Sequence, residues 1–175
     1  MGTSSILLGC VIAILWTLMG KKFTKISLIN AVLYGEQLMS TGGGWQDQIG
    51  GIVGGLKLGR SLNCIPLYID YKAIEISDSF RNQFESHLVV IYSGSVRLAK
   101  NLLQNVIQNW YIRDQRITDC FNQLLTNTDL CLQAFLNQDL EGIGGLLSKY
   151  WEQKKILAPN SEPKQVSEFF ERYSQ

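Results

Sequence analysis

The sequence predicts an α+β fold, with a mixed first part followed by a mostly helical second part. Apolar residues recur at helical spacing in several long stretches, most clearly beyond residue 98. Short alternating or β-rich runs occur in the region 56–92. The 175 residues suffice for one ordinary domain or parts of two. We place a boundary near Glu85, between residues 1–85 and residues 86–175.

Composition narrows the class of protein. Hydrophobic residues make up 46% of the chain and charged residues 18%, which suits a globular core and argues against disorder. The net charge of +1 gives no reason to expect a nucleic-acid partner or an acidic membrane surface. The four cysteines show no C-x-x-C spacing and the chain has one histidine, so a Cys/His zinc site is not expected. Reduced, mostly buried cysteines in a cytoplasmic protein are the simplest interpretation.

Residues 6–19 are almost wholly apolar and predict a buried helix. The run is shorter than the ~20 residues that span a bilayer, and a signal peptide or membrane anchor is the alternative. Residues 2–5 are Gly-Thr-Ser-Ser, and such hydroxyl side chains accept hydrogen bonds from the free N–H groups at a helix start. The free N–H groups and the positive end of the helix dipole favour phosphate there.

Residues 24–39 predict a second helix, with Thr24 as its N-cap. Glu36 falls in the last turns of this helix, where an acid interacts unfavourably with the helix dipole. We therefore expect Glu36 either to pair with a cation or to have a functional role.

The stretch 36–61 is rich in glycine. The acid that follows Glu36 in this stretch is Asp47, which is flanked by Gln46 and Gln48. Glycine lets the backbone approach a ligand closely. A flexible loop with an incidental Asp is the alternative, since a glycine-rich loop alone is a weak signal. A short helix over 46–53 would place Asp47 in its first turn.

The remaining elements follow from similar patterns. Residues 56–58 and 67–71 alternate in strand fashion, and residues 88–92 form a continuous apolar run typical of a buried strand. Residues 77–79, Ser-Asp-Ser, begin a short segment that ends at Glu85. Helices are predicted over residues 98–110, 117–136, 140–155 and 163–170.

Several motifs resemble one family of sugar kinases. The start of the chain, Gly-Thr-Ser-Ser before an apolar helix, is similar to the end of the G-L-G-S-S phosphate loop of the GHMP kinases. Residues 41–48, Thr-Gly-Gly-Gly-Trp-Gln-Asp-Gln, closely resemble fucose kinases and the related heptose-phosphate kinases. Residues 92–94, Tyr-Ser-Gly, and residues 150–155, Tyr-Trp-Glu-Gln-Lys-Lys, also resemble fucose kinases. The resemblance covers essentially the whole chain.

The resemblance implies an incomplete GHMP kinase fold. Residues 1–85 would form part of the ribosomal S5 domain 2-like N-terminal domain, and residues 86–175 the helical part of the C-terminal GHMP domain. The implied activity is ATP-dependent phosphorylation of the anomeric hydroxyl of L-fucose to fucose 1-phosphate, for GDP-fucose salvage, with ATP and Mg²⁺ as cofactors. Heptose-phosphate kinases share the Asp47 motif, so a kinase for another sugar such as a heptose phosphate stays open.

The resemblance also implies roles for individual residues. Asp47 would deprotonate or orient the attacking sugar hydroxyl, while Ser4 and Glu36 would bind Mg²⁺. The phosphate-binding residues would be Gly2, Thr3, Ser4 and Ser5. The substrate-binding residues would be Gly43, Gly44, Trp45 and Arg97.

Structural alternatives stay open for these residues. Ser4 would also serve as a plain helix cap, and Glu36 would also suit a surface ion pair with Lys25 or Arg60. Trp45 would equally fit a protein core. Arg97 would equally suit an exposed helix start.

Two parts of the family pattern are missing. The family has a strand near its N-terminus with an Arg or Lys and sugar-binding residues, and a glycine-rich motif of the type A-G-x-G-G-G-G-F near its C-terminus. We therefore expect an internal fragment or truncated isoform with little or no kinase activity alone. A non-catalytic isoform is the alternative. Neither nucleic acid nor a membrane is an expected partner, and the oligomeric state is left open.

Overall fold

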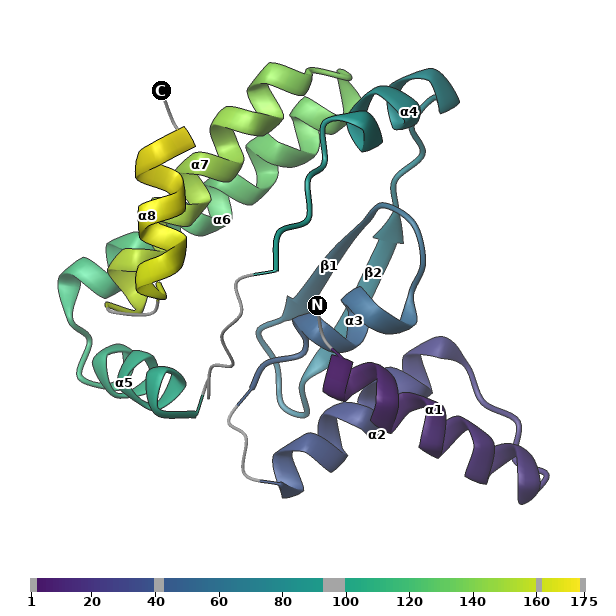
Figure 1. Ribbon diagram of the computed structural model, residues 1–175. Coiled ribbons are helices and arrows are strands. Elements are labelled where there is room, and N and C mark those ends of the chain that lie inside the picture. Colours follow the sequence, from purple (N-terminus) through teal and green to yellow (C-terminus); the bar gives the residue numbers. More distant parts are fainter. Residues whose placement is uncertain (1–2, 40–42, 93–99, 160–161, 174–175) are drawn as a thin grey trace. The chain divides into compact units, whose positions relative to one another are not determined.

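The computed structural model describes residues 3–39, 43–92, 100–159 and 162–173. The chain divides into two compact units, Met1–Glu75 and Ile76–Gln175. The first unit mixes helices with a two-stranded antiparallel sheet, and the secondary-structure elements described in the second are helices, which confirms the α+β prediction (Figure 1). The division falls earlier than the predicted boundary at Glu85.

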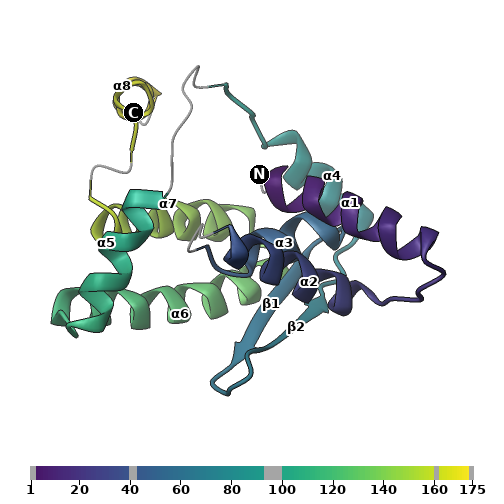
Figure 2. The same cartoon turned by 90° about the horizontal axis from the view of Figure 1, so that it is seen from below.

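In the first unit, helix α1 (Thr3–Leu18) packs against α2 (Lys25–Leu38) and the short α3 (Gln46–Ile52). Figures 1 and 2 both show α1 and α2 side by side. A hairpin follows, made of β1 (Lys57–Leu62) and β2 (Tyr68–Ala73). The three helices and the hairpin match the elements predicted from the sequence.

The start of α2 shows why the chain turns helical where it does. The Thr24 side chain accepts a hydrogen bond from the backbone N–H of Ser27 at 3.1 Å. The Ser27 hydroxyl in turn accepts one from the backbone N–H of Thr24 at 2.8 Å. This reciprocal capping box satisfies two N–H groups that the helix leaves without partners, and it confirms Thr24 as the N-cap.

The core of the first unit lies between the helices and the hairpin. Its buried residues are Ile29, Ile49, Val53 and Ile69. The two strands pair from Lys57 opposite Ala73 to Leu62 opposite Tyr68. Because successive strand residues point to opposite faces, Ile69 is buried while its neighbours Tyr68 and Asp70 are exposed.

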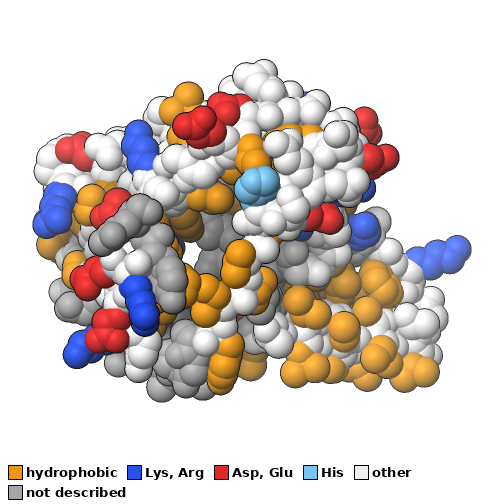
Figure 3. All heavy atoms as spheres, turned by 45° about the horizontal axis from the view of Figure 1, so that its top comes forward, with side chains coloured by type: hydrophobic (Ala, Val, Ile, Leu, Met, Phe, Trp, Pro, Cys, Tyr) orange, Lys and Arg blue, Asp and Glu red, His pale blue; other side chains and the backbone are white. Residues whose placement is uncertain are grey.

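Much of α1 does not enter that core, contrary to the prediction of a buried helix. Its buried residues are Ser5 and Gly9. Leu7, Val11, Ile14 and Leu15 are exposed, and Figure 3 shows hydrophobic side chains gathered over this helix at the lower right. The helix is apolar all round, so the face that meets α2 and α3 is not distinguished by sequence. None of the helices in the described residues combines the length and the apolar character needed to cross a membrane.

The second unit is built around two long helices, α6 (Gln115–Leu136) and α7 (Leu140–Leu157). They run antiparallel, since Cys120 contacts the backbone of Gln153 and Asn127 contacts that of Leu146. Helix α4 (Asp78–Ser86) packs on this pair through Phe80, which clusters with Ala134 and Ile143. That packing explains why α4 belongs to the second unit. The other helices are α5 (Lys100–Tyr111) and α8 (Lys164–Tyr173).

Two further predictions are wrong within the described residues. Residues 88–92 form no strand, and their side chains are exposed rather than buried. A strand needs a neighbour for its backbone hydrogen bonds, and the described strands are β1 and β2, which pair with each other. The cysteines are not mostly buried either. Cys10 and Cys64 are exposed, whereas Cys120 is buried and burial raises the pKa of its thiol.

Gly51 marks the close crossing of α3 and α1, and it supports a first prediction. A Cβ atom placed at Gly51 would overlap Cγ1 of Ile6, whereas one at Gly50 meets nothing within 4 Å. Gly51→Ala should therefore reduce the free energy of unfolding by about 1–3 kcal/mol through overpacking. The neighbouring Gly50→Ala should leave stability unchanged or raise it by up to about 1 kcal/mol. Urea unfolding of both variants measures the free energy of unfolding. Equal effects of the two substitutions would contradict the close contact between Gly51 and Ile6.

Candidate functional site

A buried carboxylate joins three segments of the first unit. The Ser5 hydroxyl donates a hydrogen bond to Oε1 of Glu36 at 2.6 Å. Nε2 of Gln48 donates one to Oε2 of Glu36 at 2.7 Å. Ser5 is 1% exposed, Glu36 7% and Gln48 0%. These contacts tie the start of α1 and the first turn of α3 to the last turns of α2.

Burial of Glu36 is tolerable because of its surroundings. A buried charge is costly unless hydrogen bonds replace its hydration, and bonds to an ionised acceptor are stronger than neutral ones. The Ser5 contact also places the carboxylate against the first turn of α1, whose positive dipole end favours an anion. The unfavourable position of Glu36 at the end of its own helix is thereby offset.

Gln48 carries an acceptor that the network leaves unused. Its Oε1 atom is buried and has no hydrogen-bond partner among the described residues. Such a group costs free energy until a donor or a cation meets it. The oxygen atoms of Ser5, Glu36 and Gln48 are hard ligands of the type that Mg²⁺ prefers.

Asp47 lies next to this network but faces elsewhere. It occupies the first turn of α3, and its side chain is exposed. Successive helix residues project about 100° apart, so Gln48 turns toward Glu36 while Asp47 faces solvent. The carboxylate of Asp47 is accessible, and its position in the first turn suits the helix dipole.

The predicted phosphate-binding residues at the start of α1 differ in burial. Thr3 and Ser4 are exposed, whereas Ser5 is buried against Glu36. The structure thus brings Ser5 to Glu36, whereas the resemblance implies Ser4 as the metal ligand that accompanies Glu36. Gly2 lies outside the described residues.

The predicted substrate-binding residues are only partly brought together. The carbonyl of Gly43 accepts a hydrogen bond from Nε2 of Gln37 at 2.7 Å, and Gly44 is exposed. Trp45 is half-buried and packs against the core cluster of the first unit. A Cβ at Gly59 would lie 2.9 Å from Cζ3 of Trp45, so the ring fills space that only glycine leaves. Arg97 lies outside the described residues.

Lys57 holds the end of α3, a role not predicted from the sequence. Its Nζ donates hydrogen bonds to the carbonyl oxygens of Gly50, Val53 and Gly55. A cation is favourable at a helix C-terminus, where the last carbonyls have no partners within the helix. The sequence signal that could have predicted this role of Lys57 is its position two residues after a glycine pair. The signal that could have predicted the role of Gln48 is its position directly after the candidate acid Asp47.

The part of the chain that the structure describes shows no cluster of side chains typical of a metal site made by protein alone. Within the described residues, no group of three or more His, Cys, Asp or Glu side chains could hold an ion. Mg²⁺ does not require one, because it usually takes one or two carboxylates and completes its shell with phosphates and water. The donor set at Glu36 therefore fits Mg²⁺ accompanied by a nucleotide.

Comparison with known proteins finds two curated relatives. The chain is 32% identical over 171 residues to a bifunctional fucokinase/GDP-fucose pyrophosphorylase of Arabidopsis thaliana, covering 98% of this chain and 16% of that protein. It is 26% identical over 166 residues to an L-fucokinase/L-fucose-1-P guanylyltransferase of Bacteroides fragilis, covering 95% of this chain and 18% of that protein. The chain thus spans less than a fifth of either relative. No protein-family model matches the chain, and no solved structure matches it.

Proposed function

Because the chain is similar along nearly its whole length to part of two enzymes whose names combine a fucokinase with a second activity, we propose that it carries catalytic residues of an ATP-dependent sugar kinase. The substrate that the relatives' names favour is L-fucose. In the proposed reaction the anomeric oxygen forms a bond to the γ-phosphorus, the bond from that phosphorus to ADP breaks, and the hydroxyl proton passes to a carboxylate. The products are fucose 1-phosphate and ADP.

One structural observation supports this proposal. The buried carboxylate of Glu36 is bonded to the first turn of α1 and to Gln48, the residue after Asp47. The acid proposed for the metal is thus bonded to the helix start proposed for phosphate and to the residue beside Asp47, the acid proposed for the sugar hydroxyl. Phosphoryl transfer depends mainly on positioning and charge neutralisation, which such a network supplies.

We propose the following roles for the residues in and beside the Glu36 network. Asp47 accepts or orients the proton of the sugar hydroxyl. Backbone N–H groups at the start of α1 bind the phosphates, and Ser4, exposed there, offers a hydroxyl to the metal. Ser5 and Gln48 hold the Glu36 carboxylate in place. Mg²⁺, when bound with ATP, would neutralise charge on the phosphates.

We also propose that the two units are parts of the two domains of a GHMP kinase. The first unit, with its glycine-rich segment and hairpin, would correspond to the N-terminal domain. The second, helical unit would correspond to the first part of the C-terminal domain. Gly43, Gly44 and Arg97 would then contact the sugar or phosphate, and Trp45 would support the segment that carries Asp47.

The experiment is a product assay with a full-length kinase that contains this segment. ATP is supplied with L-fucose, galactose, mannose or a heptose phosphate, and products are identified by ³¹P NMR. We expect fucose 1-phosphate to form fastest, and we expect little product from the isolated 175 residues. Faster phosphorylation of a heptose phosphate would contradict the assignment of L-fucose as the substrate. Absence of ATP-dependent product with every sugar would contradict the assignment of kinase activity.

A further inference from the structure

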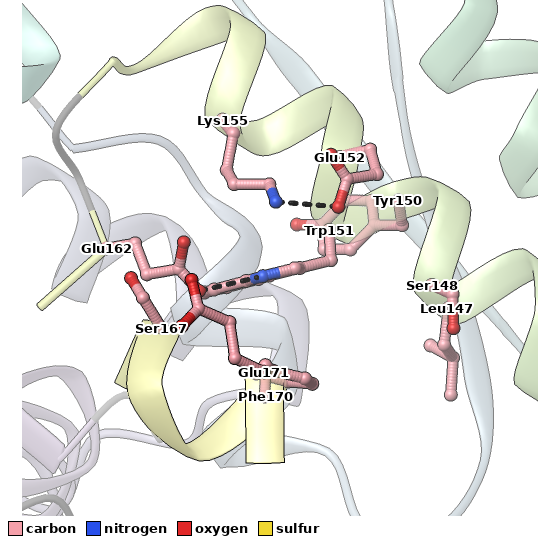
Figure 4. A pocket seen from close by; sticks show the side chains of 10 residues that line it. All are labelled: Leu147, Ser148, Tyr150, Trp151, Glu152, Lys155, Glu162, Ser167, Phe170 and Glu171. Carbon is pink, nitrogen blue, oxygen red and sulfur yellow. Dashed lines mark hydrogen bonds and ion pairs between the residues drawn. The ribbon is translucent and has the colours of Figure 1, made fainter. Parts of the chain in front are cut away.

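A cavity of about 580 Å³ lies between α7 and α8, in the second unit. Figure 4 shows side chains of both helices facing each other across it. Aromatic rings and charged groups line it together, a combination that the kinase proposal does not use.

Aromatic rings form one wall of this cavity. Trp151 from α7 and Phe170 from α8 stack with ring centroids 5.7 Å apart and an interplanar angle of 27°. The Tyr150 ring has Nζ of Lys154 5.8 Å from its centroid, so one ring of the group already lies beside a cation. Aromatic faces attract cations and offer a flat surface for a planar group.

The charged groups of the lining are mostly acidic. The lining residues include three acids, Glu152, Glu162 and Glu171, and one cation, Lys155, so their formal charge is −2. Lys155 pairs with Glu152 at 2.6 Å, and one acid of the three is thereby neutralised. The hydrogen bond to Glu152 raises the pKa of Lys155, and the negative charge of Glu162 raises it as well.

Glu162 is held in position by the aromatic wall. Nε1 of Trp151 donates a hydrogen bond to Oε1 of Glu162 at 3.2 Å, and Figure 4 shows this contact as a dashed line. Both residues are partly buried. A carboxylate fixed at the edge of an aromatic ring has less rotational freedom to lose when a ligand arrives.

We propose that this cavity binds a guanidinium group, carried by a small molecule or by an arginine side chain. A guanidinium is planar, stacks on aromatic rings and pairs two N–H groups with one carboxylate. An ammonium group carries the same charge but has no flat face. The proposal uses residues of the second unit alone, and it stands or falls independently of the kinase proposal.

The test uses the 175-residue chain and the indole N–H signal of Trp151 in ¹⁵N NMR spectra, assigned by its loss in Trp151→Phe. Ethylguanidinium should shift this signal saturably, with a dissociation constant on the order of 1 mM. The neutral analogue N-ethylurea should not shift it, and n-butylammonium should bind at least about fivefold more weakly. An equal response to the urea or to the ammonium ion, or no saturable shift with ethylguanidinium, overturns the proposal.

A matched pair of variants locates the charge. Glu162→Gln keeps an acceptor for Trp151 but removes the carboxylate, and it should weaken ethylguanidinium binding about tenfold. Glu168→Gln, on α8 but outside the lining, should leave binding unchanged. Equal weakening by both variants would contradict the site. A short peptide bearing one arginine then distinguishes the two sources of the guanidinium group. Tighter binding of the peptide than of ethylguanidinium assigns the site to an arginine side chain, and weaker binding assigns it to a small molecule.

Discussion

Replacing Asp47 by Asn should lower kcat about 10²- to 10⁴-fold in a full-length kinase that contains this segment, while ATP binding stays nearly unchanged. The amide has almost the same shape as the carboxylate but cannot accept the hydroxyl proton. Asp47 is exposed in the first turn of α3, so the substitution should scarcely affect folding. Steady-state kinetics with varied sugar and varied ATP measure the effect.

The control for Asp47→Asn is Asp70→Asn. Asp70 is an exposed acid of the same unit, on β2, and its Oδ1 accepts a hydrogen bond from the backbone N–H of Tyr71. Loss of this charge should leave kcat unchanged. Wild-type turnover in Asp47→Asn, or an equal loss in Asp70→Asn, would remove Asp47 from the proposed mechanism.

Changes at Glu36 should separate folding from function. Glu36→Leu leaves the buried Ser5 hydroxyl and Gln48 amide without their acceptor, and it should reduce the free energy of unfolding by about 3–5 kcal/mol. Glu36→Gln keeps one acceptor, and Oε1 of Gln48, which has no hydrogen-bond partner among the described residues, can accept from the new amide. Its cost should be only about 1–2 kcal/mol. Urea unfolding of the 175-residue chain measures both.

Activity distinguishes the role of Glu36 further. If its charge serves a metal–nucleotide complex, a full-length kinase carrying the well-folded Glu36→Gln should still lose most of its turnover. It should also require more Mg²⁺ for the activity that remains. Full activity in Glu36→Gln at low Mg²⁺ would show that Glu36 serves only the fold.

Local signals in the sequence predicted much of the first unit. Thr24 three residues before Ser27 defines the start of α2 through a capping box. Alternation around Ile69 predicts β2, and the Gln-Asp-Gln segment predicts a short helix with Asp47 in its first turn. Each of these signals acts within a few residues, which is why sequence alone reveals it.

Contacts between distant segments were not predictable in the same way. Ser5 and Glu36 are 31 positions apart, and nothing in the chain distinguishes Ser5 from Ser4 as the partner of Glu36. Trp45 fills the space above Gly59, a fit that depends on the register of the hairpin. Residues 88–92 have strand composition, but a strand forms only beside another strand, and composition does not reveal that neighbour.

The most direct test of the central claim locates a metal–nucleotide complex on the chain itself. Mn²⁺, a paramagnetic substitute for Mg²⁺, is added with ATP to ¹⁵N-labelled residues 1–175, and amide broadening is mapped. The account predicts that amides at the start of α1, the end of α2 and the first turn of α3 broaden at the lowest Mn²⁺, and that Glu36→Gln raises the concentration required. Earlier broadening around other acids, such as Glu141 and Glu152 of α7, would contradict it.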